Sequence, residues 1–356
     1  MRSISERLLP DVPVVESLLF EASLDNLGLT NLERDVAVQL DEKDFAVFDS
    51  PDDDLDAHIE RIKADLTPRV RFDRWREAGW ARNEGLRIQD GWTTHEDIRA
   101  IAANAAVIEL LSKLYGRQAF PFQTLNFPVG TQQHFHSDSI HFSSISERFM
   151  CGVWLALEDI HPDVGPLAYY LGSHEWPIVY NAMIGRRVCS NRAGRAQGAY
   201  EDVWQALVEA LDVKLEVFCA KKGQALIWAA NLLHGGSRQI NPELTRWSQV
   251  THYYFAGCSY HTLAFSDQLA GNLDLRQITN AASGHAVPNV CVDTSLETLL
   301  QGGPSPADAV TLPPEFDEAD YLALNADIPG GPGATTSPTA TWKTGAGDSA
   351  HGCGCP

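Results

Sequence analysis

The expected fold depends on one stretch, Thr124-Leu-Asn-Phe-Pro-Val-Gly-Thr-Gln-Gln-His-Phe-His-Ser-Asp138. It is typical of a strand, a turn at Pro128 and Gly130, and a second strand that carries His136 and Asp138. Residues i and i+2 of a strand project from the same face, so this imidazole and this carboxylate can reach one point together. The pair supplies two ligands of a candidate metal site, although a His-x-Asp triplet alone also occurs by chance.

The segments around this stretch have the pattern of a β protein. Short runs rich in β-branched and aromatic residues, separated by Gly, Pro, Asp or Asn, predict strands. Many short strands without intervening helices indicate a barrel or sandwich rather than a parallel α/β sheet. A helical insertion is predicted over residues 199–211, with Val203, Leu207 and Ala210 on one face. The predicted strands cover residues 122–127, 150–157, 167–171, 215–219, 225–228 and 248–255.

Helices are predicted mainly before these strands. Residues 1 to about 60 are acidic and weakly patterned, and a short helix is predicted over residues 56–66. The clearest helical pattern covers residues 93–115, where Thr93 and Glu96 form a capping-box pair and Gly116 lies just past the end. One apolar stripe means one buried face, so we expect this helix to pack on a sheet. The expected fold is mainly β with flanking helices.

Length and composition indicate a globular chain with an appendage. Its 356 residues have 44% hydrophobic and 21% charged content, which is ordinary for a globular protein. The net charge of −20 argues against nucleic acid or an anionic membrane as partner. From His285 onward there are nine acidic residues and one lysine, followed by Gly/Pro/Ser/Thr-rich sequence. We therefore predict one folded domain over residues 1–285 and an acidic, partly disordered tail over residues 286–356.

The seven cysteines are scattered, and Cys151, Cys219 and Cys258 lie in apolar contexts. This pattern favours reduced thiols over a disulfide framework. The N-terminus lacks the apolar run of a signal peptide, and no stretch approaches membrane-spanning length. We expect a cytoplasmic protein. The terminal pair Cys353 and Cys355 is either a metal or redox motif or two thiols of a flexible tail.

A candidate third metal ligand lies far downstream, where a predicted strand leads into His234-Gly-Gly-Ser. Two histidines and one carboxylate bound to one face leave three positions open, which suits non-haem Fe(II) enzymes that also hold a cosubstrate and O2. Arg246-Trp-Ser248 follows. On a strand, this guanidinium and hydroxyl can point into the same cavity and bind a carboxylate.

The ordered set of motifs resembles the signature of Fe(II)/2-oxoglutarate-dependent dioxygenases, and more narrowly the phytanoyl-CoA dioxygenase (PhyH-like) family. Residues 153–159, 165–167 and 171–174 are similar to that family's sequence between the triplet and the distal histidine. The resemblance covers roughly residues 60–260. It implies a double-stranded β-helix, a jelly-roll or cupin-like barrel over about residues 119–260, backed by N-terminal helices within about residues 1–118.

The resemblance also implies roles for individual residues. His136, Asp138 and His234 would hold Fe(II). Arg246 would pair with the distal carboxylate of 2-oxoglutarate, with Ser248 assisting. O2 would be the second cosubstrate, and ascorbate would support activity.

Further residues are expected around the cosubstrate. Trp154 falls where the family often places an aromatic residue, and Gln123 and Asn126 are expected to line the same pocket. Arg238 is the alternative to Arg246 as the cosubstrate anchor. The other histidines in this region are interpreted as structural or surface residues: His134, His141, His161, His174 and His252.

The predicted reaction is hydroxylation of an unactivated C–H bond with release of succinate and CO2. Asp138 separates the chain from halogenating relatives, which carry a small residue there. The substrate stays open among an acyl-CoA, an amino or hydroxy acid, and a natural-product intermediate. Two alternatives remain: a cupin-type metalloenzyme that uses His134 and His136 without 2-oxoglutarate, and a non-catalytic jelly-roll binding module. The cupin reading needs a glutamate just after the histidine pair, where the sequence has Ser137-Asp-Ser-Ile-His141.

Overall fold

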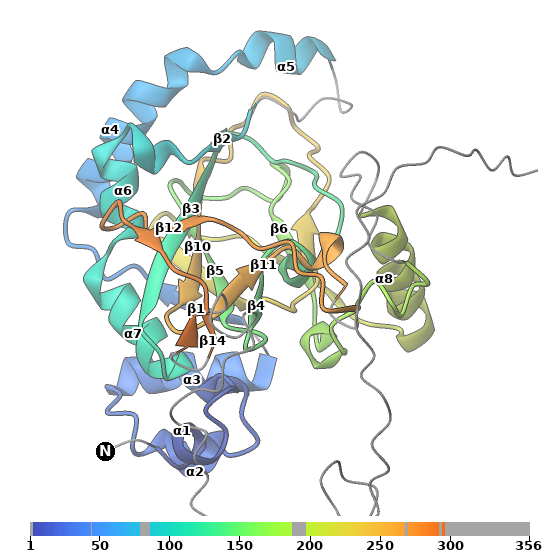
Figure 1. Cartoon of the computed structure of the whole chain (residues 1–356). Coiled ribbons are helices and arrows are strands. Elements are labelled where there is room, and N and C mark those ends of the chain that lie inside the picture. Colours follow the sequence, from blue (N-terminus) through green and yellow to red (C-terminus); the bar gives the residue numbers. More distant parts are fainter. Residues whose placement is uncertain are drawn as a thin grey trace, which may run out of the picture. The chain divides into compact units, whose positions relative to one another are not determined.

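A six-stranded antiparallel sheet lies at the centre of the fold (Figure 1). Its strand order is β1-β8-β5-β10-β3-β2. The computed structural model describes residues 3–43, 45–78, 86–186, 197–267, 270–291 and 294–295. In chain order the strands of this sheet are β1 (Phe45–Asp49), β2 (Ile88–Gln89), β3 (Ala119–Phe127), β5 (Met150–Ala156), β8 (Gln224–Ala229) and β10 (Ser248–Phe255).

A smaller sheet packs against one face of the central sheet. It consists of β7 (Leu215–Phe218), β6 (Leu167–Tyr170) and β9 (His234–Gly236). Aromatic contacts join the two layers, with ring centroids 4.4 Å apart between Phe45 and Tyr169 and 5.8 Å apart between Trp154 and Phe218. The expected fold class, mainly antiparallel β with flanking helices, is confirmed. The hydrogen-bonded ladders of the described chain form separate sheets.

The predicted strands are confirmed to within a few residues, and several short strands were not predicted. The additional two-stranded pairs are β4 (Ser143–Ile145) with β11 (Ser259–His261), β12 (Ile278–Thr279) with β13 (Ala286–Val287), and β14 (Val290–Cys291) with β15 (Thr294–Ser295). Strand β1 was also missed. It lies in the segment that looked weakly patterned, and it is defined by pairing with β8, where Phe45 lies opposite Trp228. That partner is distant in sequence.

Helices from the N-terminal part cover the other face of the central sheet (Figure 1). Buried side chains such as Leu40, Ile59 and Leu111 join the same apolar cluster as Val153 and Ile227 of the sheet. The helices are α1 (Ile4–Leu8), α2 (Phe20–Leu24), α3 (Asn31–Lys43), α4 (Leu55–Leu66), α5 (Phe72–Ala78), α6 (Glu96–Ala102), α7 (Ala105–Tyr115) and α8 (Gly198–Leu211), with short 3-10 turns η1 (Val14–Glu16), η2 (Thr67–Arg69), η4 (Gly91–Thr93), η5 (Asp138–Ile140), η6 (Ser173–Glu175) and η7 (Leu263–Phe265).

The helix expected over residues 93–115 is two helices. The side chain of Asn104 accepts hydrogen bonds from backbone N–H groups in the first turn of α7, so it caps the N-terminus of a second helix. The expected capping box of Thr93 and Glu96 is absent, because the Thr93 hydroxyl donates to the Asp90 carbonyl instead. Gly116 ends α7 in the left-handed conformation, as expected, with φ of 73°.

Two further expectations need correction. Residues 124–138 do not form two strands, because β3 ends at Phe127 and no second strand follows within this stretch. Instead, His136 makes a single β-bridge to His234, and Asp138 begins η5. In α8 the apolar face was expected to carry Val203, Leu207 and Ala210. The buried residues are instead Tyr200 and Trp204, which pack in one apolar cluster with Leu233 and Leu263.

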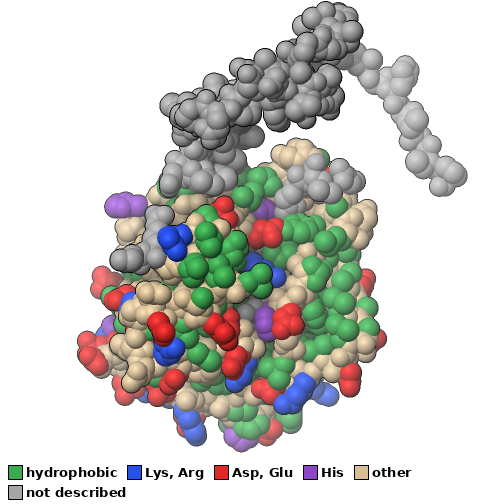
Figure 2. Space-filling model, turned by 90° about the horizontal axis from the view of Figure 1, so that it is seen from below, with side chains coloured by type: hydrophobic (Ala, Val, Ile, Leu, Met, Phe, Trp, Pro, Cys, Tyr) green, Lys and Arg blue, Asp and Glu red, His purple; other side chains and the backbone are tan. Residues whose placement is uncertain are grey.

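The tail beyond residue 295, including Cys353 and Cys355, lies outside the described residues. No described helix is both long and apolar enough to cross a membrane. On the face drawn in Figure 2, acidic and basic side chains are interspersed among apolar ones.

Candidate metal centre and cosubstrate pocket

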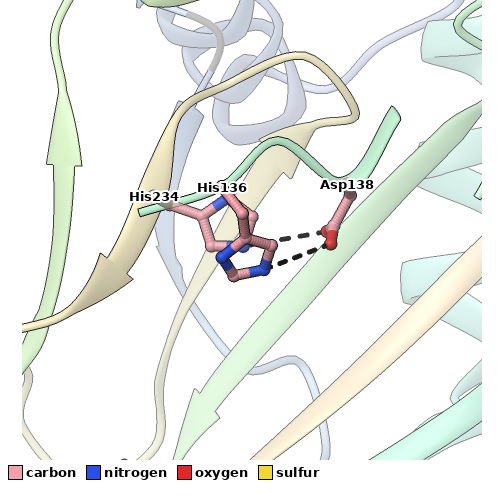
Figure 3. Close-up of side chains that lie close together, drawn as sticks. All are labelled: His136, Asp138 and His234. Atoms are coloured by element: carbon pink, nitrogen blue, oxygen red, sulfur yellow. Dashed lines mark ion pairs between the residues drawn. The ribbon is translucent and has the colours of Figure 1, made fainter. Parts of the chain in front are cut away.

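Three buried side chains converge between the two sheets: His136, Asp138 and His234 (Figure 3). One ligand atom from each lies within 4.8 Å of the other two. The Nε2 atom of His136 is 3.7 Å from Oδ1 of Asp138, and the Nε2 atom of His234 is 3.8 Å from Oδ2. These separations are too long for hydrogen bonds and leave room for an ion bound to all three.

Backbone pairing brings the two histidines together. The N–H of His136 donates to the carbonyl of His234 at 2.9 Å, and the N–H of His234 donates back at 3.0 Å. The two glycines after His234 allow this approach. A Cβ on Gly235 would lie 2.8 Å from the Gln133 carbonyl oxygen, and one on Gly236 would lie 2.8 Å from the Gln132 nitrogen. The His-Gly-Gly motif is therefore a requirement of close packing.

Backbone carbonyls fix the orientation of both imidazoles. Nδ1 of His136 is 2.9 Å from the carbonyl oxygen of His134, and Nδ1 of His234 is 2.9 Å from that of Leu232. An N–H at each Nδ1 leaves Nε2 with its lone pair directed at the cluster, which is the tautomer that binds a metal. The ring of His134 is exposed and makes no part of the cluster, so the cupin-type use of His134 with His136 is wrong.

Burial sets the protonation state of the cluster. It lowers the pKa of His136 to about 3, and the neighbouring His234 acts in the same direction. Burial alone would raise the pKa of Asp138, but the surrounding histidines and a hydrogen bond from Trp228 lower it to about 2. At neutral pH a carboxylate therefore lies beside the unprotonated imidazole of His136, as metal binding requires.

The Asp138 carboxylate is positioned from the central sheet. The indole Nε1 of Trp228 donates to its Oδ2 at 2.8 Å. Trp228 lies opposite Gly152 in the ladder of β8 and β5, and a Cβ on Gly152 would come within 2.1 Å of the indole ring. Glycine therefore makes the space in which the indole lies. His252 of β10 completes this wall, with Nε2 3.6 Å from the same Oδ2.

A cavity of about 520 Å³ opens beside the cluster. The pleat of β3 turns Gln123, Leu125 and Phe127 toward it, and Val250 and His252 of β10 lie on the same face. Asn126 does not line the cavity, contrary to expectation. It has the opposite pleat position, where its Nδ2 donates to Gln249 at 3.1 Å on the helix side of the sheet.

Arg246 is a buried cation in the wall of this cavity. Its Nη1 donates to the carbonyl of Gly165 at 2.9 Å, while its Nε is buried without a hydrogen-bond partner. Burial lowers the pKa of its guanidinium to about 10. None of the described carboxylates lies within ion-pair distance of it, so the positive charge has no protein counterion in that part of the chain. Arg238, the alternative anchor, is exposed and lies outside the cavity wall.

Two more buried donors lack partners near Arg246. They are Nε1 of Trp154 and the hydroxyl of Ser248. Ser248 pairs with Phe127 in the ladder, and the Arg246 guanidinium lies 5.8 Å from the Phe127 ring centre. Trp154 lines the cavity from β5. Buried polar groups are normally hydrogen-bonded, so three unsatisfied donors in one region indicate a polar ligand.

The model of the phytanoyl-CoA dioxygenase family matches residues 46–246, which is more than half of the chain. The chain belongs to the phytanoyl-CoA dioxygenase family. It is accordingly an oxygenase, and the resemblance read from its motifs is confirmed. The match contains β1 from Ala46 onward, the three clustered ligands and Arg246 as its last residue.

Two of the solved structures with a similar fold are SnoK and EctD. The non-heme α-ketoglutarate-dependent carbocyclase SnoK from nogalamycin biosynthesis has 13% identity and a TM-score of 0.49, over 70% of this chain and 94% of SnoK. EctD from S. alaskensis, solved with 2-oxoglutarate and 5-hydroxyectoine, has 16% identity and a TM-score of 0.45, over 62% of this chain and 74% of EctD. Similarity at this level carries no inference about activity. No curated protein matches the chain.

Sequence reasoning missed part of the dioxygenase cavity wall. His252 and His141 line the cavity, which their interpretation as structural or surface residues did not predict, although neither belongs to the His-Asp-His cluster. His252 could have been found from strand periodicity, because it shares a face with Ser248 and Val250. Arg276 could not, because it follows the last long strand and reaches the cavity by a loop path that no local pattern predicts.

Proposed function

We propose that this family member is an Fe(II)- and 2-oxoglutarate-dependent dioxygenase that hydroxylates an unactivated C–H bond of a small molecule, with release of succinate and CO2. One observation carries the proposal. A buried His-Asp-His cluster and a buried arginine without a described counterion share one cavity.

The donor set fits Fe(II). Two imidazole nitrogens and one carboxylate, from His136, His234 and Asp138, match the facial ligand set of non-haem iron oxygenases. Each of these ligand groups has a hydrogen-bond contact, to a backbone carbonyl or to Trp228, that holds it in place without a metal ion. Ligand groups that need no rearrangement lose less entropy on binding.

The unsatisfied donors fit 2-oxoglutarate. Arg246 would bind its distal carboxylate through the guanidinium fork, and the Ser248 hydroxyl and the Trp154 indole would donate to cosubstrate oxygens. Gln123 supports the wall by contacting Nδ1 of His252 at 3.0 Å. Asn126 has no place in this arrangement because it faces away from the cavity.

Bound iron, 2-oxoglutarate and O2 would supply the oxidation of the C–H bond. The protein's own residues would bind the substrate and cosubstrate, orient them and remove water from around them. Trp154, Val250 and Trp228 form apolar walls that exclude water from the reacting groups. Asp138 occupies the ligand position that halogenating relatives leave open, which favours hydroxylation.

We also propose a catalytic domain followed by a separate acidic tail. Compositional change after Gly284 supports this division. The boundary expected at residue 285 lies too early, because β13 (Ala286–Val287) pairs with β12 and the N–H of Val290 donates to the Cys258 carbonyl. A cytoplasmic location is proposed on the scattered cysteines.

Succinate release tests the proposal. Purified protein with Fe(II), 2-oxoglutarate, ascorbate and O2 should release succinate, faster when a substrate is present. Arg246→Gln should raise the 2-oxoglutarate concentration needed for half-maximal release by about a hundredfold, because a desolvated charge pair is lost. Arg238→Gln, which removes an exposed arginine, is the matched control and should behave as wild type. No succinate from wild-type protein with bound iron, under any substrate tested, would contradict the proposal.

A further inference from the structure

A second arginine in the same cavity has the same unsatisfied character as Arg246. Nη1 of Arg276 donates to the His141 carbonyl at 3.3 Å and to the Thr262 hydroxyl at 3.4 Å. Its Nε is buried without a hydrogen-bond partner. Within the described ranges, no carboxylate lies at ion-pair distance from this guanidinium. One side of the group is anchored, and the side formed by Nε and Nη2 is available to a ligand.

The anchor holds the guanidinium in a defined plane. Its central carbon lies 4.9 Å from the centre of the Phe142 ring, so the group stacks on an aromatic face. Phe142 in turn lies 4.9 Å from the ring of His252. The guanidinium is held at one edge and stacked on one face. Its side chain therefore loses little conformational entropy when a ligand binds the remaining edge.

The two arginines lie at different ends of the cavity wall. Arg246 stacks near Phe127, which pairs with Ser248 at the start of β10, whereas Arg276 reaches the wall through Phe142 beside His252. Ser248 and His252 are four residues apart on an extended strand, a separation of roughly 13 Å at about 3.3 Å per residue. One distal carboxylate of 2-oxoglutarate cannot satisfy both arginines.

We propose that Arg276 binds a carboxylate of the primary substrate side-on through Nε and Nη2, so that the substrate is a small carboxylic acid. This inference rests on the proposed function, since it assigns Arg246 to the cosubstrate. The edge pair of a guanidinium matches the two oxygens of a carboxylate in spacing and charge. Phe142 and Phe265 give the rest of the substrate apolar contact.

The volume of the cavity supports a small acid. The cavity of about 520 Å³ must also hold the cosubstrate, which leaves room for a compact molecule and not for an entire coenzyme A thioester. Arg276 lies beyond residues 46–246, the range that the family model matches. The recognition group therefore belongs to the segment after β11, outside the matched range.

Ligand binding under anaerobic conditions tests this assignment. A panel of amino, hydroxy and arylalkanoic acids, each with its primary amide, is titrated by ligand-observed NMR into protein saturated with Fe(II) and 2-oxoglutarate. At least one acid should bind wild type about tenfold or more tightly than its amide. Arg276→Gln should remove this preference. Arg276→Lys, which keeps the charge and loses the fork, should keep only part of it.

Arg87→Gln is the matched control, because Arg87 lines the same cavity but is exposed. It should keep the preference for acids, since a solvent-screened charge contributes little. Circular dichroism and Tm establish that each variant is folded. The Arg276 assignment is overturned if no acid is preferred over its amide, or if Arg276→Gln and Arg87→Gln lower the preference equally. Wild-type protein that fails to bind Fe(II) or 2-oxoglutarate would instead contradict the proposed function itself.

Discussion

The indole Nε1 of Trp228 donates a 2.8 Å hydrogen bond to Oδ2 of Asp138, from a strand of the central sheet to the first residue of a 3-10 turn. The bond ties a candidate metal ligand to the central sheet. It also leaves Oδ1 and the second lone pair of Oδ2 for an ion. The position of the carboxylate is thus set before metal binding.

Trp228→Phe should weaken Fe(II) binding by about ten- to a hundredfold, the usual cost of losing a hydrogen bond to a metal ligand. Anaerobic titration of Fe(II) measures the dissociation constant. Trp92→Phe is a matched control, because Trp92 also donates through Nε1 to a carboxylate, that of Asp90, at 3.2 Å and outside the cluster. Equal dissociation constants for Trp228→Phe and wild type would show that the bond does not position Asp138.

Gly152→Ala should destabilise the protein by about 1–3 kcal/mol, because the new methyl group overpacks the sheet against the indole. Urea unfolding measures the change. In the Gly152→Ala background, Trp228→Leu should cost less than it does in wild type, since a smaller side chain relieves the overlap. Additive effects of the two substitutions would contradict direct contact between these positions.

Arg246→Met should separate stability from function. Replacing a buried cation that has no described counterion with an apolar side chain should raise the free energy of unfolding by about 1–2 kcal/mol without cosubstrate. The same variant should lose 2-oxoglutarate binding. Urea unfolding with and without 2-oxoglutarate checks both statements. A variant less stable than wild type without the cosubstrate would indicate that Arg246 is compensated within the fold.

Asp97 provides a pH-dependent link between α4 and α6. Hydrogen bonds from Arg61 lower the pKa of Asp97 from its ordinary 3.8 to about 2, and His58 contributes a further bond of 2.7 Å. A depressed pKa in the folded state stabilises the protein above pH 4, and the effect disappears as the pH falls from about 4 to about 2.

Asp97→Asn should therefore lower the free energy of unfolding by about 1–2 kcal/mol at pH 7, a value reduced for screening because the Arg61 side chain is 54% exposed. The difference between variant and wild type should vanish near pH 2. Denaturant unfolding from pH 7 to pH 2 measures it. A difference that stays constant over this range would show that the carboxylate charge is not responsible.

The sequence allowed prediction of the strands and ligands because their signals are local. The β-branched and aromatic residues of the run 248–255 and the His-Gly-Gly sequence each indicate a conformation without knowledge of partners. Strand β1 was missed because its definition depends on pairing with β8, and the helix over residues 93–115 was predicted as one because the Asn104 cap competes with a continuous apolar stripe. Asn126 was misplaced because residues 122–127 alone do not say which face of the strand meets the cavity.

The geometry of the site depends on contacts that local patterns do not record. His136 and Asp138 were expected on one strand face, whereas the structure brings them together through a single bridge and a 3-10 turn. The roles of Trp228 and Gly152 in positioning Asp138 follow from the strand register, which places the two residues opposite each other. The sequence could therefore predict which residues form the cluster, and only the fold shows what holds them.

Anaerobic titration of Fe(II) in the presence of 2-oxoglutarate tests the central claim most directly. Wild-type protein should bind about one equivalent of iron and develop the visible charge-transfer absorption of an Fe(II)–2-oxoglutarate complex. His136→Ala should lose both signals, because one of three protein ligands is removed. His134→Ala, two residues away, should retain both, since only the backbone carbonyl of His134 contacts the site. Wild-type protein without this absorption, or His136→Ala with full iron binding, would contradict the account.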